Sequence, residues 1–351
     1  MKNLPFVTIV IPCRNEEKFI GKCLDSIIAN DYPKDRIEAL VIDGMSQDRT
    51  REIIKGYASR YPFIKLLDNP KKITPAALNT GIRNTKGEII MRMDAHATYE
   101  TDYIKKCVLA SQKYSADNVV GIWKILPRGK GFIDKAIVSA LSSSFGVGNA
   151  KYRTGSCKQP EWVDTGAYGC YKKDIFKKIG QFNEKLIHSQ DMEFNLRLKR
   201  AGGKTLLVPD AVVYYYARTD FISFCKYNFR NGVWAILPFK YTSIMPVLWR
   251  HLVPLVFVSS LIGSAILSFF SPIFLYLLLL ISTPYLLISI FFSCKIASKE
   301  KNLRYLFLMP VIYASLHISY GLGSLIGLIR ASFSKKFWMN LRAISAGKNN
   351  V

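Results

Sequence analysis

The amino-acid sequence predicts an α/β domain with a doubly wound, mostly parallel sheet, followed by C-terminal transmembrane helices. Two observations lead to this prediction. In roughly the first 240 residues, short apolar runs typical of strands alternate with segments of helical periodicity, which is the order expected of parallel strands joined by crossover helices. Farther along, the 43 residues from Leu252 to Cys294 contain no Asp, Glu, Lys or Arg.

The strand–helix alternation can be followed element by element. The apolar, β-rich run 6–12 is the first expected strand, and Pro12 ends it. Thr74 and Pro75 have the residue types of a helix start, as a cap followed by the first helical position. The remaining expected strands are 39–42, 64–70, 89–94 and 205–208, and the expected helices are 14–30, 50–61, 74–87, 102–114 and 190–200. The Gly- and Ser-rich region 119–162 shows no clear pattern.

Polar residues follow three of the expected strands. They are Arg14-Asn15-Glu16 after the first strand, Asp43 and Asp48 after the second, and Asp94 with His96 after the strand at 89–94. Doubly wound sheets bind ligands beyond the carboxyl ends of their strands, so these groups should meet at one crevice. No GxGxxG follows the first strand, which disfavours a dinucleotide-binding dehydrogenase.

The C-terminal part predicts a membrane attachment of two to three helices. A span needs about 20 apolar residues, so 252–294 suffices for two with a turn near Ser271-Pro272, and the 25 uncharged residues 305–329 suffice for one. Basic residues mark both the segment before 305 and the tail after 329 as cytoplasmic, and one span between them cannot satisfy both. We favour three spans; the alternative is a re-entrant segment at 305–329, which Pro310 and Gly321-Leu322-Gly323 would permit.

Charge and cysteine content limit the classes of function that the sequence supports. The formal net charge is +24, but no compact basic motif with interleaved aromatics indicates nucleic-acid binding. A basic face toward anionic lipid and a site for polyanionic substrates such as diphosphates both remain open. Seven scattered cysteines without a CxxC pair indicate reduced thiols in a cytosolic domain, and no secretory signal precedes the first strand.

Four segments, in order, resemble the family-2 glycosyltransferases with the GT-A fold, and in particular the succinoglycan-biosynthesis-like, membrane-anchored enzymes of exopolysaccharide assembly. The resemblance covers about residues 5–240 and includes the "DAH" variant and "VDTGAYG". The segments are "VTIVIPCRNEEKFIGKCLDSI", "LVIDGMSQDRT", "AALNTGI" with "KGEIIMRMDAH", and "GQFNEKLIHSQDMEFNLRLKRAGG".

The resemblance implies a donor site and a metal site. Pro12, Arg14 and Glu16 would lie beside the nucleotide, and Asp43 would face its base, although Gly44 replaces the second acid of the common "DDGS" form. Asp94 is the first acid of the family's DxD metal motif and would also touch the donor. His96 stands where the second Asp usually does. An imidazole beside a carboxylate suits Mn²⁺ better than Mg²⁺, and either cation would offset the charge of the leaving diphosphate.

On the acceptor side, the resemblance implies that Asp191 is the general base, with Gln190 in place of the common Glu. Asp164 could hold the acceptor or form an Asx-type turn. "FRNGVW" resembles the arginine–tryptophan segment of the family, which would place Arg230 near a diphosphate and Trp234 near the acceptor; Trp234 could equally be an interfacial anchor.

Together these features predict an inverting, metal-dependent hexosyltransferase. It would move a sugar from a nucleotide-diphosphate sugar to a polyprenyl-diphosphate-linked saccharide in cell-surface glycan assembly. The expected parts are a cytoplasmic catalytic domain (1–220), an interfacial segment (221–250), a domain in the cell membrane (251–330) and a basic tail (331–351). A processive polysaccharide synthase and a non-catalytic membrane scaffold are the alternatives.

Overall fold

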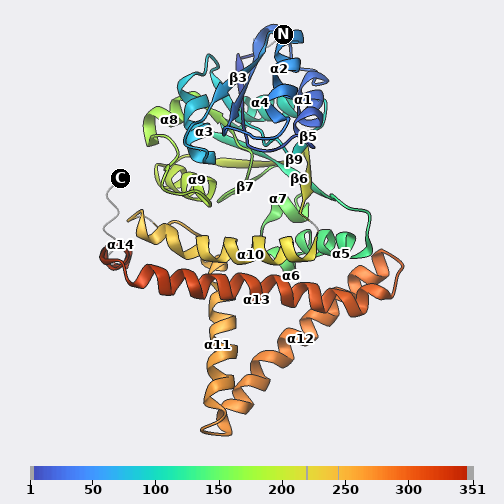
Figure 1. Ribbon diagram of the computed structural model, residues 1–351, viewed down its shortest axis with the longest axis vertical. Coiled ribbons are helices and arrows are strands. Elements are labelled where there is room, and N and C mark those ends of the chain that lie inside the picture. The colour runs from blue at the N-terminus through green and yellow to red at the C-terminus, as the bar shows by residue number, and fades with distance from the viewer. Residues whose placement is uncertain (1–3, 219, 244, 346–351) are drawn as a thin grey trace. The chain divides into compact units, whose positions relative to one another are not determined.

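The structure is a computed structural model that describes residues 4–218, 220–243 and 245–345. The chain forms two compact units. One contains residues 1–124 and 151–216, and the other contains 125–150 and 217–350, each within the described ranges. We describe each unit by itself (Figure 1).

Four parallel strands form one half of the sheet in the first unit. They lie in the order β3-β2-β1-β4, and the register pairs Cys13 at the end of β1 with Asp43 at the end of β2. β1 and β2 are almost wholly buried because Val, Ile and Leu fill them and helices connect parallel strands across the sheet faces. The strands are β1 (Val7–Cys13), β2 (Ile37–Asp43), β3 (Ile64–Asp68) and β4 (Ile89–Arg92), and the connecting helices are α1 (Ile20–Ile28), α2 (Thr50–Arg60) and α3 (Thr74–Arg83).

The other half of the sheet is antiparallel, so the sheet is mixed and the predicted parallel arrangement is limited to β1–β4. The described pairs of β4 with β8, β8 with β6, β9 with β5 and β9 with β7 all run antiparallel. Antiparallel pairs need no crossover helix, which is why the strand–helix alternation gave no sign of them. These strands are β5 (Ala97–Tyr99), β6 (Asn118–Pro127), β7 (Glu161–Val163), β8 (Cys170–Lys172) and β9 (Thr205–Ala217).

Helices after β4 complete the first unit. Phe176, Phe182 and Phe194 pack against one another with ring centroids 4.5 to 6.1 Å apart, in a core that also contains apolar residues of β1, β2 and α3. The predicted helix 190–200 is confirmed as α9. Thr74 is the first residue of α3 instead of its cap, since Ile73 occupies the N-cap. The helices are α4 (Tyr103–Tyr114), α7 (Lys151–Thr154), α8 (Lys173–Ile179) and α9 (Gln190–Arg200).

The second unit is helical. Within the described residues, three helical segments are long and apolar enough to cross a membrane: Trp249–Leu267, Ile273–Lys299 and Arg304–Ser332. In Figure 1, α10 and α13 run side by side and α11 and α12 form a hairpin. The helices are α5 (Phe132–Leu141), α6 (Ser144–Val147), α10 (Phe221–Ile236), α11 (Val253–Leu267), α12 (Ile273–Lys299), α13 (Arg304–Ser332) and α14 (Lys335–Ser345), with 3-10 turns η2 (Leu237–Lys240) and η3 (Trp249–His251).

Residues 125–150 were expected to lie within the cytoplasmic domain 1–220, but in the structure they belong to the second unit. Two polar contacts hold them there. The Tyr313 hydroxyl lies 2.9 Å from Ser143 Oγ, and Nε2 of His317 lies 3.0 Å from the carbonyl oxygen of Phe145. Buried polar groups in apolar helices need such partners, and α6 supplies them. The other predicted domain boundaries stay predictions.

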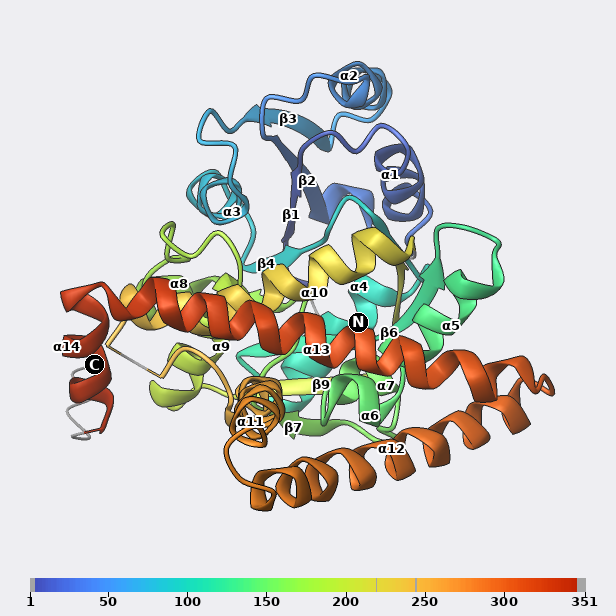
Figure 2. The same ribbon diagram turned by 60° about the horizontal axis from the view of Figure 1, so that its bottom comes forward.

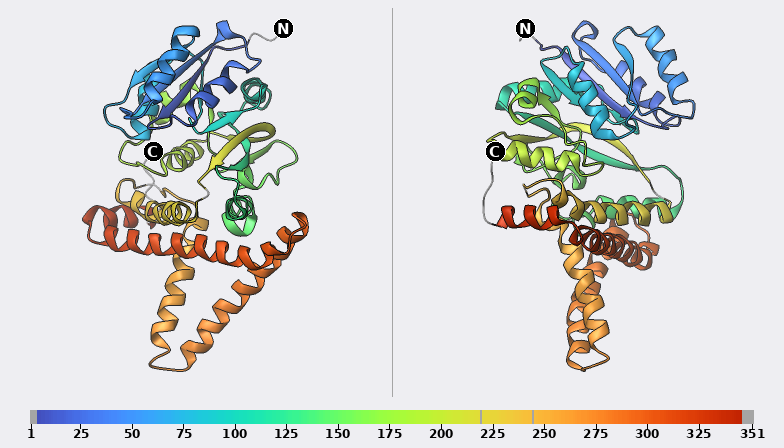
Figure 3. Two further views of the ribbon diagram at one scale, coloured as in Figure 1. Left: turned by 45° about the vertical axis from the view of Figure 1, so that its right-hand side comes forward. Right: turned by 60° about the vertical axis from the view of Figure 1, so that its left-hand side comes forward.

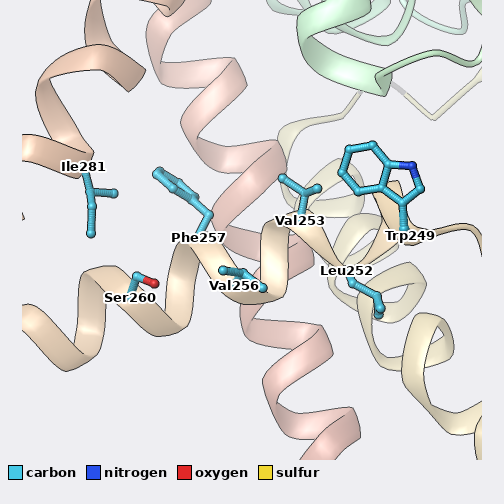
Figure 4. A pocket seen from close by; sticks show the side chains of 7 residues that line it. All are labelled: Trp249, Leu252, Val253, Val256, Phe257, Ser260 and Ile281. Atoms are coloured by element: carbon cyan, nitrogen blue, oxygen red, sulfur yellow. The ribbon is translucent and has the colours of Figure 1, made fainter. Parts of the chain in front are cut away.

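An apolar cavity of about 550 Å³ lies between α11 and α12 (Figure 4). Trp249, Phe257 and Ile281 are among its lining residues, and Ser260 supplies the one hydroxyl. None of the described residues that line it is ionisable, so it has the composition of a lipid-contacting groove and not that of a catalytic cleft.

Candidate active site

The carboxyl ends of β2, β1 and β4 lie next to one another in the first unit, as the sequence predicts. Their loops are joined by hydrogen bonds. The backbone N–H of Asn15 donates to Ser46 Oγ at 2.8 Å, and the backbone N–H of Gln47 donates to the side chain of Asn15 at 2.9 Å. Asn15 and Met45 both have left-handed backbone conformations (φ 55° and 57°), which turn these two loops tightly at the strand ends. Hydrogen bonds and tight turns therefore fix the shape of the loops at this edge of the sheet.

Asp43 is held firmly at this edge. Its side chain is fully buried and accepts hydrogen bonds from the backbone N–H of Ser46 at 3.0 Å and from Arg51 at 2.7 Å. Arg51 also reaches Asp68 at 2.8 Å, so one guanidinium joins the ends of β2 and β3. Because the Asp43 carboxylate has these partners, its first effect is to fix the loop at 44–48.

The absence of a side chain at Gly44 makes room for the side chain of Arg14. A Cβ added at Gly44 would lie 3.2 Å from the aliphatic part of the Arg14 side chain, which is exposed at the edge. The glycine that replaces the usual second acid therefore allows Arg14 to lie against the loop after β2. Pro12 is partly exposed beside it, near the end of β1.

Glu16 and His96 meet across the edge. Nδ1 of His96 lies 3.2 Å from a carboxylate oxygen of Glu16, and both side chains are partly exposed. His96 also packs edge-on against Tyr215 of β9, with ring centroids 5.5 Å apart. The carboxylate fixes the orientation of the imidazole, in the way that acceptors orient metal-binding histidines.

Arg92 joins the two acids that the resemblance assigns to metal binding and base catalysis. Its Nε and Nη2 donate to the two carboxylate oxygens of Asp94 at 2.9 and 3.1 Å, and its Nη1 lies 3.8 Å from Oδ2 of Asp191. β4 supplies Arg92, the loop after it supplies Asp94, and the first turn of α9 supplies Asp191.

Sequence reasoning gave Arg92 no role. The guanidinium is buried and lies over the Tyr168 ring, 5.7 Å from its centroid. Burial alone would lower the pKa of Arg92, but the charges of Asp94 and Asp191 outweigh it and raise the pKa above its ordinary value. The sequence contained one indication of such a role, because a charged residue ends the apolar run Ile89–Met91. A buried arginine needs charged partners, so acids were to be expected near it.

Three buried polar atoms close to these acids have no hydrogen-bond partner among the described residues. They are Nη1 of Arg92, Oε1 of Gln190 and Nε1 of Trp123. Trp123 stacks on Tyr168 and Tyr215, with centroids 4.9 and 4.6 Å away, and so belongs to the aromatic cluster that contacts both Arg92 and His96. Buried donors and acceptors without partners cost free energy, and a polar ligand is one way to satisfy them.

The structure does not bring every predicted residue to this edge. Asp164 follows β7 with its side chain half exposed and pairs with Lys199, while Glu193 is buried against Arg197 in an ion pair within α9. Arg230 and Trp234 belong to α10 of the other unit. Nε of Arg230 is buried without a hydrogen-bond partner among the described residues.

The residues fit a divalent cation only if a substrate supplies most of its ligands. Over the described ranges, no group of three or more His, Cys, Asp or Glu side chains is placed to hold a metal. Both oxygens of Asp94 already accept from Arg92, but a carboxylate has about four lone-pair sites. Mg²⁺ is commonly bound by one or two carboxylates plus phosphate oxygens, which is the set that Asp94 could join, with His96 as a nitrogen ligand.

Comparison with known proteins gives one consistent set of relatives. Residues 8–180 match the model of "Glycosyl transferase family 2". The chain is 30% identical over 337 residues to dolichyl N-acetyl-alpha-D-glucosaminyl phosphate 3-beta-D-2,3-diacetamido-2,3-dideoxy-beta-D-glucuronosyltransferase of Methanococcus voltae, covering 94% of this chain and 99% of that protein. It is 31% identical over 249 residues to succinoglycan biosynthesis protein ExoA of Rhizobium meliloti, covering 70% of this chain and 74% of the other. The crystal structure of GalNAc-T7 with UDP, GalNAc and Mn²⁺ superposes with a TM-score of 0.50 at 18% identity, over 63% of this chain and 45% of that chain, which is a similarity of fold.

Proposed function

The chain belongs to glycosyltransferase family 2 and has the GT-A fold, and we propose that it transfers a sugar, with inversion, from a nucleoside-diphosphate sugar to a lipid-linked saccharide. The observation that carries this proposal is the position of Arg92 between Asp94 and Asp191. The acid of the DxD-like segment and the acid of α9 lie on either side of one buried charge, which supports a shared role in the transfer.

The donor would lie over the ends of β1 and β2. Asp43, fixed by Ser46 and Arg51, would face the nucleobase or ribose from a rigid loop. Pro12 and Arg14 would line the nucleotide beside it, and Arg14 would bring positive charge toward the diphosphate.

The diphosphate would lie against Asp94, His96 and Glu16. A Mn²⁺ or Mg²⁺ ion bound there would offset the negative charge that grows on the leaving group. Asp94 would provide a carboxylate ligand. Glu16 would hold Nδ1 of His96, which would leave Nε2 available as a metal ligand.

Asp191 would act as the general base. The acceptor hydroxyl oxygen forms a bond to the anomeric carbon as the bond from that carbon to the phosphate oxygen breaks. The electron pair leaves with the nucleoside diphosphate, and the hydroxyl proton passes to Asp191. Nη1 of Arg92 lies 3.8 Å from this carboxylate and would help to hold it in position.

A lipid-linked acceptor accounts for the C-terminal helices. By its name, the relative from Methanococcus voltae acts on a dolichyl-phosphate-linked sugar, and the similarity extends over 94% of this chain. A polyprenyl phosphate or diphosphate would keep its saccharide at the membrane surface, with Gln190, Asp164, Arg230 and Trp234 as candidate contacts. We place the protein in the cell membrane with its catalytic domain in the cytoplasm.

The test measures nucleoside-diphosphate release by membranes that contain the protein, over a panel of nucleotide sugars, with Mn²⁺, Mg²⁺ or EDTA and with polyprenyl-linked saccharide extract. The Asp191→Asn variant should lower kcat by about 10²- to 10⁴-fold. The matched control is Asp174→Asn, a change of an exposed carboxylate in α8 of the same unit.

Release by the wild type and the control but not by Asp191→Asn supports the proposal. Products that carry long runs of the same sugar would indicate a processive synthase instead. Silence of the wild type with every donor and acceptor would favour a scaffold without catalysis.

A further inference from the structure

Of the three helices that could cross a membrane, we propose that α13 does not. It lies in the plane of the bilayer, at the surface where α11 begins, so that α11 and α12 alone form the membrane-inserted hairpin. The partner of α13 is thus the interfacial layer of an anionic membrane. This proposal concerns the second unit and does not depend on the transferase reaction.

The first observation is that α13 packs lengthwise on α10, a helix that contains charged residues. A Cβ at Gly323 would overlap the carbonyl oxygen of Phe229, and one at Gly232 would overlap that of Tyr320, so the two backbones touch. The hydroxyl of Ser324 adds a hydrogen bond to the Gly232 carbonyl at 3.2 Å. Figure 1 and Figure 2 both show α13 beside α10 along most of α10.

α10 cannot lie in the hydrocarbon layer. Its 16 residues include Lys226, Asn228 and Arg230, and charged side chains at the centre of a bilayer cost several kcal/mol each. A helix that lies along α10 therefore lies at the depth of α10, which is the membrane surface.

The second observation is where α13 crosses the hairpin. Gly321 lies against Pro254 and Val258, in the first two turns of α11. Trp249, Arg250 and His251 come directly before α11, and Trp249 is 75% exposed, as expected of a residue at the lipid–water interface. α13 thus meets α11 near its polar end.

The pictures agree with this crossing. In Figure 2, α11 is seen nearly end-on while α13 runs across the view. In Figure 3, the turn between α11 and α12 lies at the far end of the hairpin, away from α13. A third span would instead accompany the hairpin down to that turn.

The third observation is the exposed stripe of α13. Six large apolar residues are exposed along it at alternating intervals of four and seven, which places them on one face: Phe307, Val311, Ile318, Leu322, Ile329 and Phe333. α11 and α12 are much more exposed, since 11% and 6% of their most apolar stretches are buried, against 39% for α13. The exposed apolar side chains of α13 therefore lie on one face, as they would in a helix that rests on the bilayer surface.

The charges at the two ends of α13 fit the same arrangement. Lys299, Lys301 and Arg304 precede or open the helix, and Arg330, Lys335 and Lys336 end or follow it. Basic residues flanking membrane helices stay on the cytoplasmic side, where anionic lipids attract them. A spanning α13 would put one of the two groups on the wrong side, and an interfacial α13 puts both on the same side. The conflict left by the sequence is thereby removed.

Single cysteines at the two ends of α13 test the proposal. The background is the full chain with Cys225→Ser and Cys294→Ser, because the other five cysteines are buried. Glu300→Cys and Lys335→Cys, both at exposed positions, are treated with a membrane-impermeant maleimide in intact cells and in inside-out vesicles. We expect both to react in the vesicles and neither in cells. Reaction of one from each side would show that α13 spans and would overturn the proposal.

A depth measurement gives an independent readout. Spin labels at Val311→Cys, Ile318→Cys and Ile329→Cys, all on the exposed stripe, are compared with a label at Leu280→Cys of α12. An interfacial α13 keeps all three labels within about 5–10 Å of the headgroup boundary, with Leu280→Cys deeper. If Ile318→Cys alone lies near the midplane, about 15 Å down, α13 crosses the bilayer and the proposal fails.

Discussion

Arg92 holds Asp94 in a two-pronged ion pair, with N–O distances of 2.9 and 3.1 Å. The third nitrogen of the same guanidinium lies 3.8 Å from Asp191 and makes no hydrogen bond among the described residues. Two carboxylates that stand almost 100 residues apart in the sequence therefore share one counter-charge. A change in any of the three side chains should alter the other two.

Replacement of Arg92 by methionine should damage both stability and activity. Breaking one partner from a buried ion pair typically costs about 3–5 kcal/mol, and here the change leaves two carboxylates facing each other. We expect Arg92→Met to lower the melting temperature of the purified protein and to abolish measurable transfer.

The Arg92→Lys variant tests the fork geometry of the guanidinium separately from its positive charge. Lysine retains the charge but cannot make the fork geometry with Asp94, so it should restore part of the stability and a small part of kcat. Full kcat of Arg92→Lys together with a lowered melting temperature would mean that Arg92 serves the fold alone.

Metal dependence should be sensitive to Glu16, although this residue need not touch the ion. Glu16 holds Nδ1 of His96 at 3.2 Å, and loss of such a supporting contact typically weakens metal affinity by about 10- to 100-fold. We expect Glu16→Gln to raise the Mn²⁺ concentration for half-maximal activity by that factor, with little change in the melting temperature.

The neighbouring Glu17→Gln is the matched control, because the Glu17 carboxylate instead accepts from the backbone N–H of Arg49 at 3.1 Å. It should leave the Mn²⁺ titration unchanged. Equal responses of the two variants would remove the case for His96 as a metal ligand.

The sequence was sufficient for the parallel half of the fold. Buried parallel strands are continuous apolar runs, and β1, β2, β3 and β4 begin within two residues of where such runs predict them. The meeting of the strand ends also followed, since it depends only on the order of β2, β1 and β4.

The other features of the fold and of the site depend on contacts between distant residues, which leave no pattern in the local sequence. Arg92 could be read as an ordinary strand residue until α9 brought Asp191 to it. Residues 125–150 pack through Ser143 and Phe145 on helices more than 160 positions away. The glycines of α13 permit a break in a helix as readily as a close contact, and only the position of α10 decides between these.

Gln190 offers a test in which stability and activity move in opposite directions. Its side chain is 6% exposed, and Oε1 has no hydrogen-bond partner among the described residues. Gln190→Met keeps the shape and removes a buried, unsatisfied acceptor, so stability should stay the same or rise. If the amide binds substrate, KM should rise about tenfold, the equivalent of one hydrogen bond.

Gln181→Met is the comparison for that variant, since Gln181 is partly exposed and its oxygen accepts from Arg83 at 3.3 Å. It should leave KM unchanged. A Gln190→Met variant with unchanged KM and higher stability would mark the amide as a packing residue.

The contact between α10 and α13 can be tested with a single methyl group. A Cβ at Gly323 would overlap the backbone oxygen of Phe229, whereas one at Gly263 of α11 would meet nothing within 4 Å. Both glycines lie in apolar helices, so Gly→Ala changes helix propensity in the same sense at the two sites. Gly323→Ala must push two backbones apart, which typically costs about 1–3 kcal/mol, and should lower the melting temperature in detergent. Gly263→Ala should leave it unchanged or raise it. If the two variants have the same melting temperature, the backbones of α10 and α13 do not touch at Gly323. In that case α10 does not fix the depth of α13.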